Sequence, residues 1–341
     1  MSQLFPTELI GSYALPSWLW MMIERAEERG DLGESDIEET LNDAVNMALL
    51  DQEKAGIDVL TDGEMRRRDF IQNFYGLVSG LNKISAKRTF GSAGYDQNPR
   101  YEVTGQVTAP NGLGIVEELE YMQTQTDKPC KICVPGPITL SLPLILKGGY
   151  EDKEALIDDM TVIVNAEMKA LVAAGATYLQ VDEPRYATSH EDARKLITIY
   201  NKTRAGVDAR VGLHFCFGNF KGRSHDKRDY SYITPNLGNA ECDQFNFEFA
   251  NREFNQIELL AQLPPESMVG VGVVDVKSYF VETPEQVATG IRLAAQHVAA
   301  ERIVVTPDCG FNHCPRHVAF AKMQSMVAGA AIVRAEVAGK T

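Results

Sequence analysis

The stretch RVGLHFC (210–216) is a short apolar run without strict alternation of polar and apolar residues. A run of this kind is typical of a parallel strand that is buried on both faces. Seven other runs fit the same description: ELIGSY (8–13), IDVLTD (57–62), KICVPG (131–136), YLQVDE (178–183), DQFNFE (243–248), VGVGVVD (269–275) and RIVVTPD (302–308). Eight buried strands in a chain of 341 residues predict a (β/α)8 barrel.

Helix-patterned segments separate most of these runs. Residues 34–56 and 152–175 carry apolar residues at a spacing near 3.6, and each segment ends at a glycine. Thr283, Pro284 and Gln286 form a capping-box pattern that predicts another helix start. The competing fold is an open doubly wound sheet, which is disfavoured because no GxGxxG opens a helix after the first run. We therefore expect a single α/β barrel domain over residues 1–341.

The stretch 83–112 fits neither a barrel strand nor a helix. It contains RYEVTGQVTAP (100–110), which has the pattern of a hairpin strand. We expect this stretch to form an extended loop or hairpin after the second barrel strand. Such a loop is placed to cover the mouth of the barrel.

Composition narrows the classes of function. The net charge of −14 disfavours binding to nucleic acid or to anionic membranes. The start of the chain does not read as a signal peptide, and there is no run of 18 apolar residues, so no membrane segment is expected. Six cysteines spread over a long chain favour free thiols in a reducing cytoplasm. The basic stretch 66–68 is expected to form salt bridges on the barrel rim.

Candidate functional residues lie where the predicted strands end, because the chemistry of (β/α)8 barrels is located there. These ends carry Ser12, Glu64, Asp182, His214 with Cys216, Glu248, Asp275 with Lys277, and Asp308 with Cys309. In contrast, Cys130 and Cys133 are three residues apart on a strand, so they point to opposite faces and are expected to be ordinary packing residues.

His214, Cys216 and Cys309 are the candidate metal ligands. His214 and Cys216 are two residues apart on a strand, so both side chains point to one face. Together with Cys309 they form a mixed nitrogen and sulfur set suited to Zn2+. Glu248 is the candidate fourth ligand, because a thiolate easily displaces a carboxylate. The competing interpretation is that these cysteines are ordinary core residues.

The same residues resemble the zinc site of the cobalamin-independent methionine synthase family. The resemblance rests on His214-x-Cys216, on Glu248 within FEF (247–249) and on Cys309 within PDCG (307–310). Other motifs follow in the order of the family: IGSY (10–13), DVLTDGEMRRRDF (58–70), VPGPITL (134–140) and LQVDEP (179–184). The motifs extend over nearly the whole chain, which resembles the short "core" versions of the family that lack its N-terminal barrel.

The resemblance implies a reaction and a role for each residue. Zinc held by the four candidate ligands would bind the thiol of homocysteine as a thiolate, which attacks a methyl carbon to form methionine. Glu248 would be the ligand that yields to the thiol. Glu64 and Asp182 would receive the substrate ammonium group, and Ser12 would help to hold its carboxylate. Asp308 is expected to orient the ligands and not to bind metal.

Two departures from the family leave the methyl donor open. In the long members of the family the N-terminal barrel helps to hold folate, and this chain resembles the versions without it. A methyl-corrinoid, free or on a corrinoid protein, is therefore a candidate methyl donor beside a methyl-folate. Lys277 stands where the long members carry a histidine thought to relay a proton, and lysine is a poor relay near neutral pH. One alternative function is alkyl or epoxide transfer to coenzyme M, although Glu64 and Asp182 would repel its sulfonate. The other alternative is a non-enzymatic zinc-binding partner or sensor.

Overall fold

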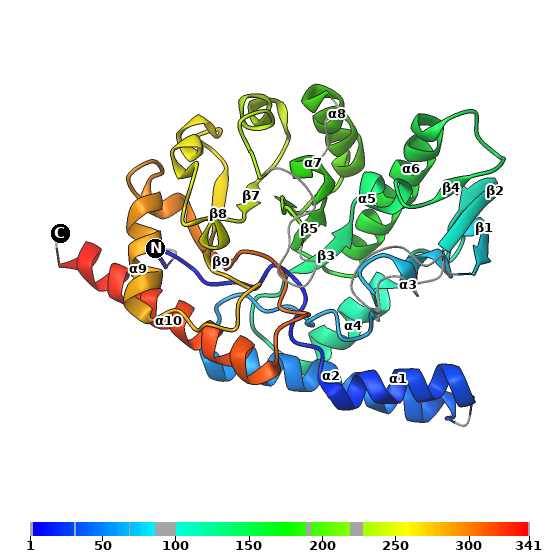
Figure 1. Cartoon of the computed structure of the whole chain (residues 1–341), viewed down its shortest axis with the longest axis horizontal. Coiled ribbons are helices and arrows are strands. Elements are labelled where there is room, and N and C mark those ends of the chain that lie inside the picture. Colours follow the sequence, from blue (N-terminus) through cyan, green and yellow to red (C-terminus); the bar gives the residue numbers. More distant parts are fainter. Residues whose placement is uncertain are drawn as a thin grey trace.

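Six parallel strands form the continuous part of the barrel wall in the computed structural model of this protein (Figure 1). The structure describes residues 3–30, 32–67, 69–85, 100–188, 192–218 and 228–339. In order of pairing, the strands are β3 (Ile132–Pro135), β5 (Tyr178–Asp182), β6 (Arg210–His214), β7 (Gln244–Phe247), β8 (Met268–Val274) and β9 (Ile303–Pro307). All neighbours in this order are parallel, so their carboxyl ends lie at one rim.

Two segments near the N-terminus complete the ring between β9 and β3. They pair through isolated parallel bridges, which join Thr7 to Val305, Glu8 to Val59 and Leu60 to Cys130. The backbone N–H of Lys131 also donates to the carbonyl of Leu60 at 2.8 Å. Eight parallel segments therefore enclose the interior, which confirms the predicted (β/α)8 barrel. The open doubly wound alternative is wrong, because its sheet would have two unpaired edges.

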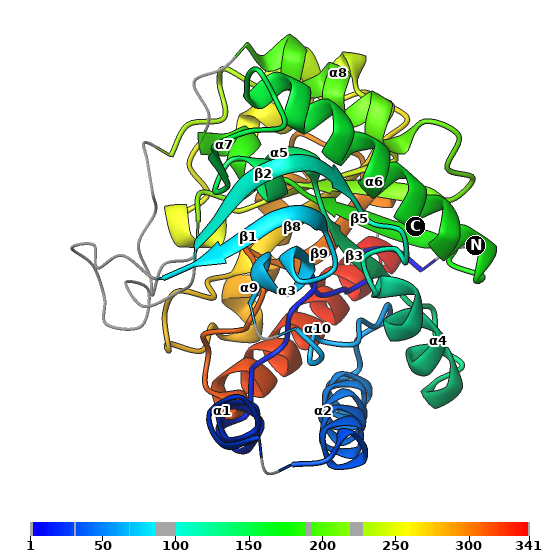
Figure 2. The same ribbon diagram turned by 90° about the vertical axis from the view of Figure 1, so that its right-hand side faces the viewer.

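Helices surround the barrel wall (Figures 1 and 2). The α-helices are α1 (Ser17–Arg29), α2 (Glu34–Ala55), α3 (Gln72–Tyr75), α4 (Ile115–Gln125), α5 (Pro137–Ser141), α6 (Lys153–Ala173), α7 (Arg185–Thr188), α8 (Ala193–Arg204), α9 (Pro284–Ala294) and α10 (Arg316–Ala338). Short 3-10 helices are η1 (Thr234–Asn239), η2 (Ala250–Arg252), η3 (Ile257–Gln262) and η4 (Ala300–Arg302). The predicted capping box is confirmed, because Gln286 N donates to Thr283 Oγ1 and Thr283 N donates to Gln286 Oε1.

A β-hairpin follows the second barrel segment, as the sequence predicts. It consists of β1 (Ser79–Ile84) and β2 (Arg100–Thr108), which are antiparallel and run side by side in Figure 2. The short strand β4 (Ile145–Leu146) pairs in parallel with β2 and joins the hairpin to the segment before α6. The part of the predicted loop between residues 86 and 99 lies outside the described residues.

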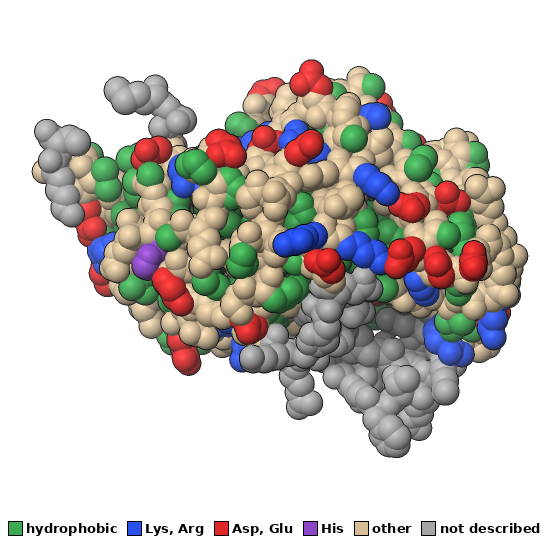
Figure 3. Space-filling view, turned by 90° about the horizontal axis from the view of Figure 1, so that it is seen from above, with side chains coloured by type: hydrophobic (Ala, Val, Ile, Leu, Met, Phe, Trp, Pro, Cys, Tyr) green, Lys and Arg blue, Asp and Glu red, His purple; other side chains and the backbone are tan. Residues whose placement is uncertain are grey.

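The surface carries charges of both signs. On the face shown in Figure 3, basic side chains are interspersed with acidic ones. Lys202 and Asp158 form one such exposed ion pair, with a distance of 2.9 Å between Nζ and Oδ1. Within the part of the chain that the structure describes, every helix is too short or too polar to cross a lipid bilayer.

A network of polar side chains fills part of the barrel interior, which we call the interior network: Glu8, Lys131, Gln180, Gln244 and Asn246. Lys131 Nζ donates to Glu8 Oε1 and to Gln180 Oε1, both at 2.9 Å. Gln244 Nε2 donates to Glu8 Oε1 at 2.7 Å, and Asn246 Nδ2 donates to Gln180 Oε1 at 2.9 Å. All five side chains are fully or almost fully buried, so they form hydrogen bonds with one another and with neighbouring protein groups such as the Tyr178 hydroxyl, and not with solvent.

The ion pair in this network makes Lys131→Met a test of the interior. We expect the free energy of unfolding to fall by about 3–5 kcal/mol, because the variant leaves the Glu8 carboxylate buried without its cation. Chemical denaturation measures the loss. Lys202→Met is the matched control, because Lys202 and Asp158 are 56% and 61% exposed, and its removal should change stability by less than about 1 kcal/mol. Equal losses in the two variants would contradict the role of the buried pair.

Candidate metal centre and substrate pocket

Three candidate ligands meet at the carboxyl rim of the barrel. His214 is the last residue of β6, Cys216 follows it by two residues, and Cys309 follows the end of β9 by two residues. Their ligand atoms all lie within 4.8 Å of one another, and the two thiol sulfurs are 3.4 Å apart. Because adjacent parallel strands end at the same rim, residues far apart in sequence converge here. Two sulfurs and one imidazole nitrogen are a donor set that suits zinc.

His214 is oriented by Asp182. The Nδ1 atom of His214 lies 2.8 Å from Asp182 Oδ1, whereas its buried Nε2 atom has no hydrogen-bond partner among the residues that the structure describes. Burial lowers the pKa of His214, but the hydrogen bond with Asp182 and the nearby Cys216 side chain outweigh it and raise the pKa to about 9. An imidazole that is held by a carboxylate through one nitrogen and leaves the other free beside thiols is the arrangement that a metal ligand requires.

Glu248 lies beside this cluster, and its two carboxylate oxygens contact different groups. It follows β7 directly, and its Oε2 atom is 3.4 Å from Cys216 Sγ. Its Oε1 atom accepts a hydrogen bond from Lys277 Nζ at 2.6 Å. Glu248 is not one of the three residues whose ligand atoms lie within 4.8 Å of one another. The carboxylate is thus next to the thiols, but it is paired with a lysine.

Asp308 holds the backbone that follows Glu248. Its carboxylate accepts the backbone N–H groups of Phe249, Ala250 and Asn251 at 2.6–2.8 Å. Burial, followed by the nearby Glu248 carboxylate, raises the pKa of Asp308 well above its usual range. The side chain is fully occupied by these amides, which suits an orienting residue better than a ligand. Asp275 makes a similar local contact, accepting from the backbone N–H of Lys277 at 2.8 Å.

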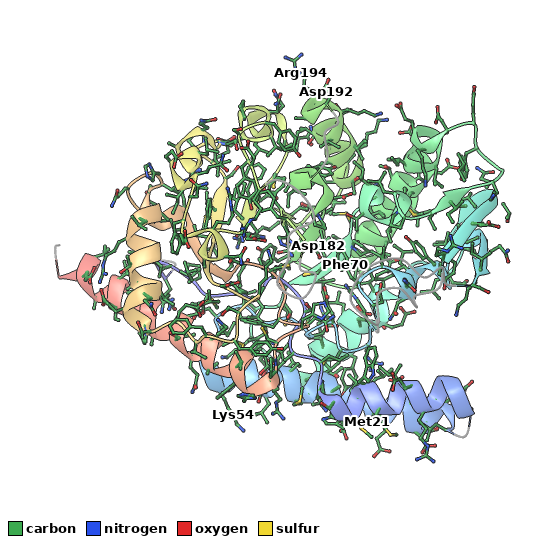
Figure 4. All side chains as sticks on the ribbon, in the orientation of Figure 1. Met21, Lys54, Phe70, Asp182, Asp192 and Arg194 are labelled. Atoms are coloured by element: carbon green, nitrogen blue, oxygen red, sulfur yellow. The ribbon has the colours of Figure 1, made fainter. Side chains whose placement is uncertain are left out.

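A second cluster adjoins the first and shares Asp182 with it. Ligand atoms of Glu64, Cys133 and Asp182 lie within 4.8 Å of one another, and Asp182 lies at the centre of the barrel in Figure 4. Burial raises the pKa of Glu64 to about 8, with Arg67 opposing the shift and Asp182 adding to it. Cys133, expected to be a packing residue, therefore lies beside two candidate substrate-binding carboxylates. Cys130, which precedes Cys133 by three residues, is not part of this cluster and donates a hydrogen bond to the Lys128 carbonyl.

Ser12 lies on the same side of the pocket as Glu64. Both line a small hollow together with Arg67, Phe70 and Asn312. A Cβ atom added to Gly310 would come within 2.0 Å of Ser12 Oγ, so the residue after Cys309 must be a glycine for the serine to keep this place. The hydroxyl of Ser12 and the carboxylate of Glu64 thus border one space.

Arg67 does not lie on the rim, where the sequence predicted it. The basic stretch 66–68 was expected on the rim, and Arg66 does pair with exposed Glu38, whereas Arg68 lies outside the described residues. Arg67 is instead buried, and its guanidinium contacts Glu118 at 2.6 Å and Glu64 at 3.3 Å. Burial of the neighbouring acids without a cation would be costly, which explains why an arginine lies inside. The sequence offers little indication of this, because Arg66 and Arg67 are adjacent and identical and yet differ in burial.

The fold and the rim define an α/β-barrel enzyme whose pocket joins a candidate metal centre to a pair of carboxylates. Residues 5–332 match the family described as the cobalamin-independent synthase catalytic domain. A methionine synthase of Sulfurisphaera tokodaii is 34% identical over 99% of this chain and 95% of that protein. A methionine synthase of Saccharolobus solfataricus is also 34% identical, over 99% of this chain and 97% of that protein.

Solved structures agree with these relatives. The B12-independent methionine synthase from Shewanella sp. W3-18-1, solved in complex with selenomethionine, has a TM-score of 0.84 and 27% identity over 98% of this chain and 99% of that one. A Listeria monocytogenes protein with a TM-score of 0.72 and 18% identity, over 97% of this chain and 99% of that one, shares the fold. The chain belongs to the cobalamin-independent methionine synthase family. It is an S-methyltransferase of the methionine synthase type.

Proposed function

We propose that this protein transfers a methyl group to the thiol of homocysteine and so forms methionine. The observation that carries the proposal is the meeting of His214, Cys216 and Cys309 next to the carboxylates Glu64 and Asp182. An amino-acid thiol carries one sulfur and one ammonium group, and the two clusters match these groups. The selenomethionine bound to the Shewanella relative is an amino acid of the same class as the proposed product.

We propose that zinc is the metal and that His214, Cys216 and Cys309 hold it, with Glu248 as the exchangeable fourth ligand. The fit rests on the unpartnered Nε2 atom of His214 and on the two thiols beside it. Bound zinc would hold the substrate thiol as a thiolate near neutral pH. Asp182 keeps the His214 ring in place, and Asp308 keeps the backbone after Glu248 in place.

The substrate sulfur forms a bond to the methyl carbon as the bond between that carbon and the donor breaks, and the donor leaves with the bonding electrons. Glu64 and Asp182 bind the ammonium group, and Ser12 helps to bind the carboxylate. Asp182 Oδ1 already accepts from His214 and from Gln180, so Asp182 Oδ2 is the oxygen left for the substrate. One residue thereby sets the distance between the sulfur and the ammonium subsites.

The donor that we propose is a methyl-folate. The family is described as cobalamin-independent, which counts against a corrinoid or a corrinoid protein as partner. The decisive assay incubates zinc-loaded protein and homocysteine with methyl-tetrahydrofolate or with methylcobalamin and measures methionine. Methionine from methylcobalamin alone would refute the folate donor. Methylation of coenzyme M in place of homocysteine would refute the proposed substrate.

Glu64 predicts a pH dependence for ligand binding. With a pKa of about 8, its carboxyl group is mostly protonated at pH 7, and it must lose this proton to pair with an ammonium group. Affinity for methionine, which has no thiol to ionise, should therefore rise between pH 6 and 8 by up to about tenfold per pH unit. Calorimetry at several pH values measures this slope. Glu64→Gln should remove the slope, and a slope that persists in this variant would assign it to another group.

A further inference from the structure

Glu248 has a buried cation within reach, and the two form a closed pair. The side chains of Lys277 and Glu248 are 2% and 0% exposed, and Nζ and Oε1 are 2.6 Å apart. The other oxygen, Oε2, faces Cys216 Sγ at 3.4 Å and the backbone N–H of Phe217 at 3.5 Å. The groups that face the lysine are thus Glu248, the thiols Cys216 and Cys309, and the nearby carboxylate of Asp308.

The backbone on both sides of this pair is held firmly. The N–H of Glu248 donates to the Tyr230 hydroxyl at 3.0 Å, and Asp308 holds the next three amides. Asp275 Oδ1 accepts from the backbone of Lys277 at 2.8 Å and from Asn251 Nδ2 at 3.2 Å, which ties the lysine segment to the glutamate segment. These contacts hold the backbone and do not involve the side-chain carboxylate of Glu248 or the ammonium group of Lys277.

We propose that Lys277 is a positioning residue that keeps the Glu248 carboxylate paired once the substrate sulfur has taken its ligand position. The proposal rests on the proposed function, in which Glu248 is the exchangeable ligand. It assigns Lys277 to the binding of the thiol and not to proton relay toward the methyl donor. The structure already has the arrangement that this role requires, with Oε1 of Glu248 on the lysine and Glu248 outside the three-residue ligand cluster.

The charges explain why a cation is required. A metal held here would exchange its Glu248 ligand for the substrate sulfur, and the thiol proton would pass to solvent. The displaced carboxylate has no access to water, because Glu248 is fully buried. A buried carboxylate without a partner is strongly unfavourable, so without Lys277 it would stay on the metal and compete with the thiol.

The experiment measures thiol binding without methyl transfer. Protein loaded with Co2+ in place of zinc is titrated with homocysteine, and the visible absorption of the metal reports the entry of sulfur. Lys277→Met should keep its metal but bind homocysteine at least about tenfold more weakly, because breaking a buried pair strands one charge. Lys277→Arg keeps the positive charge and should restore binding to within about threefold of the native protein. If Lys277→Met does not fold, Lys277→Gln gives the same comparison.

A double-mutant cycle separates this role from direct contact with substrate or donor. In a Glu248→Ala background there is no carboxylate for Lys277 to pair with. Lys277→Met should therefore cause no further loss of homocysteine binding. Native affinity in Lys277→Met, or equal weakening in both backgrounds, would overturn the proposal. A native protein whose Co2+ spectrum does not respond to homocysteine would instead refute the proposed function, because the thiol would then not reach the metal.

Discussion

Cys309→Ser should lose both bound zinc and methyl transfer. The Cys309 sulfur is 3.4 Å from that of Cys216, and these two are the sulfur atoms of the three-residue ligand cluster. The variant therefore leaves the cluster with one sulfur. A serine hydroxyl is a far poorer ligand than a thiolate, because it is not deprotonated near neutral pH. Loss of an outer-shell partner of a metal ligand typically costs about 10–100-fold in metal affinity, so loss of a ligand itself should exceed about a hundredfold.

Zinc content by elemental analysis and methionine formation measure this effect together. Cys242→Ser is the matched control, because Cys242 is a buried thiol that donates to the Gln244 carbonyl at 3.0 Å, close to the start of β7 and not at the rim. It should keep one zinc and full activity. A Cys309→Ser protein that is active without metal would remove the basis of the proposed mechanism.

Asp182→Asn should weaken both zinc binding and amino-acid binding, whereas Glu64→Gln should weaken amino-acid binding alone. Asp182 Oδ1 accepts from His214 Nδ1 and from Gln180 Nε2, both at 2.8 Å. An asparagine can keep these two bonds through its carbonyl, but its NH2 group then faces the substrate ammonium where an oxygen did. We expect zinc affinity to fall by about 10–100-fold, as for loss of an outer-shell carboxylate, and amino-acid binding to fall as well.

Glu64→Gln makes the comparison specific. Glu64 belongs to the cluster with Cys133 and Asp182 and not to the ligand cluster of His214, so this variant should bind zinc normally. It should lose about ten- to a hundredfold in affinity for methionine above pH 8, where a charged hydrogen bond is lost. Competition with a chromophoric chelator measures zinc affinity, and calorimetry measures methionine affinity. Zinc loss in Glu64→Gln, or unchanged zinc affinity in Asp182→Asn, would show that the two subsites are not joined as the hydrogen bonds indicate.

The sequence predicted the fold and the meeting of the candidate ligands because one geometric rule applies to both. Parallel strands in a barrel end at a common rim, so His214, Cys216 and Cys309 could be placed together from their positions after strand-like runs. The segments that contain the runs at 8–13 and 57–62 pair with their neighbours through isolated bridges at Thr7, Glu8, Val59 and Leu60. The pattern of residues identifies a strand but does not state how long its pairing is.

The pairing of individual polar side chains could not be predicted. Glu248 was expected with the other ligands, yet its Oε1 atom lies on Lys277, because the choice among partners depends on the register and side-chain angles of β7 and β8. The interior network was missed because the runs were classed as apolar. A signal was available: Gln244, Asn246 and Glu248 alternate along one strand, and a period of two places them all on one face.

The interior network has a consequence for anyone who wishes to transplant this thiol chemistry into another scaffold. Gln180 donates to Asp182 through Nε2 only because Lys131 and Asn246 occupy its Oε1 atom and so decide which way the amide points. A recipient barrel with an aliphatic interior could receive every residue of the rim, and Asp182 would then keep its contact with His214 but lose the hydrogen bond from Gln180. A successful transfer of the site must therefore include the interior network together with the residues of the rim.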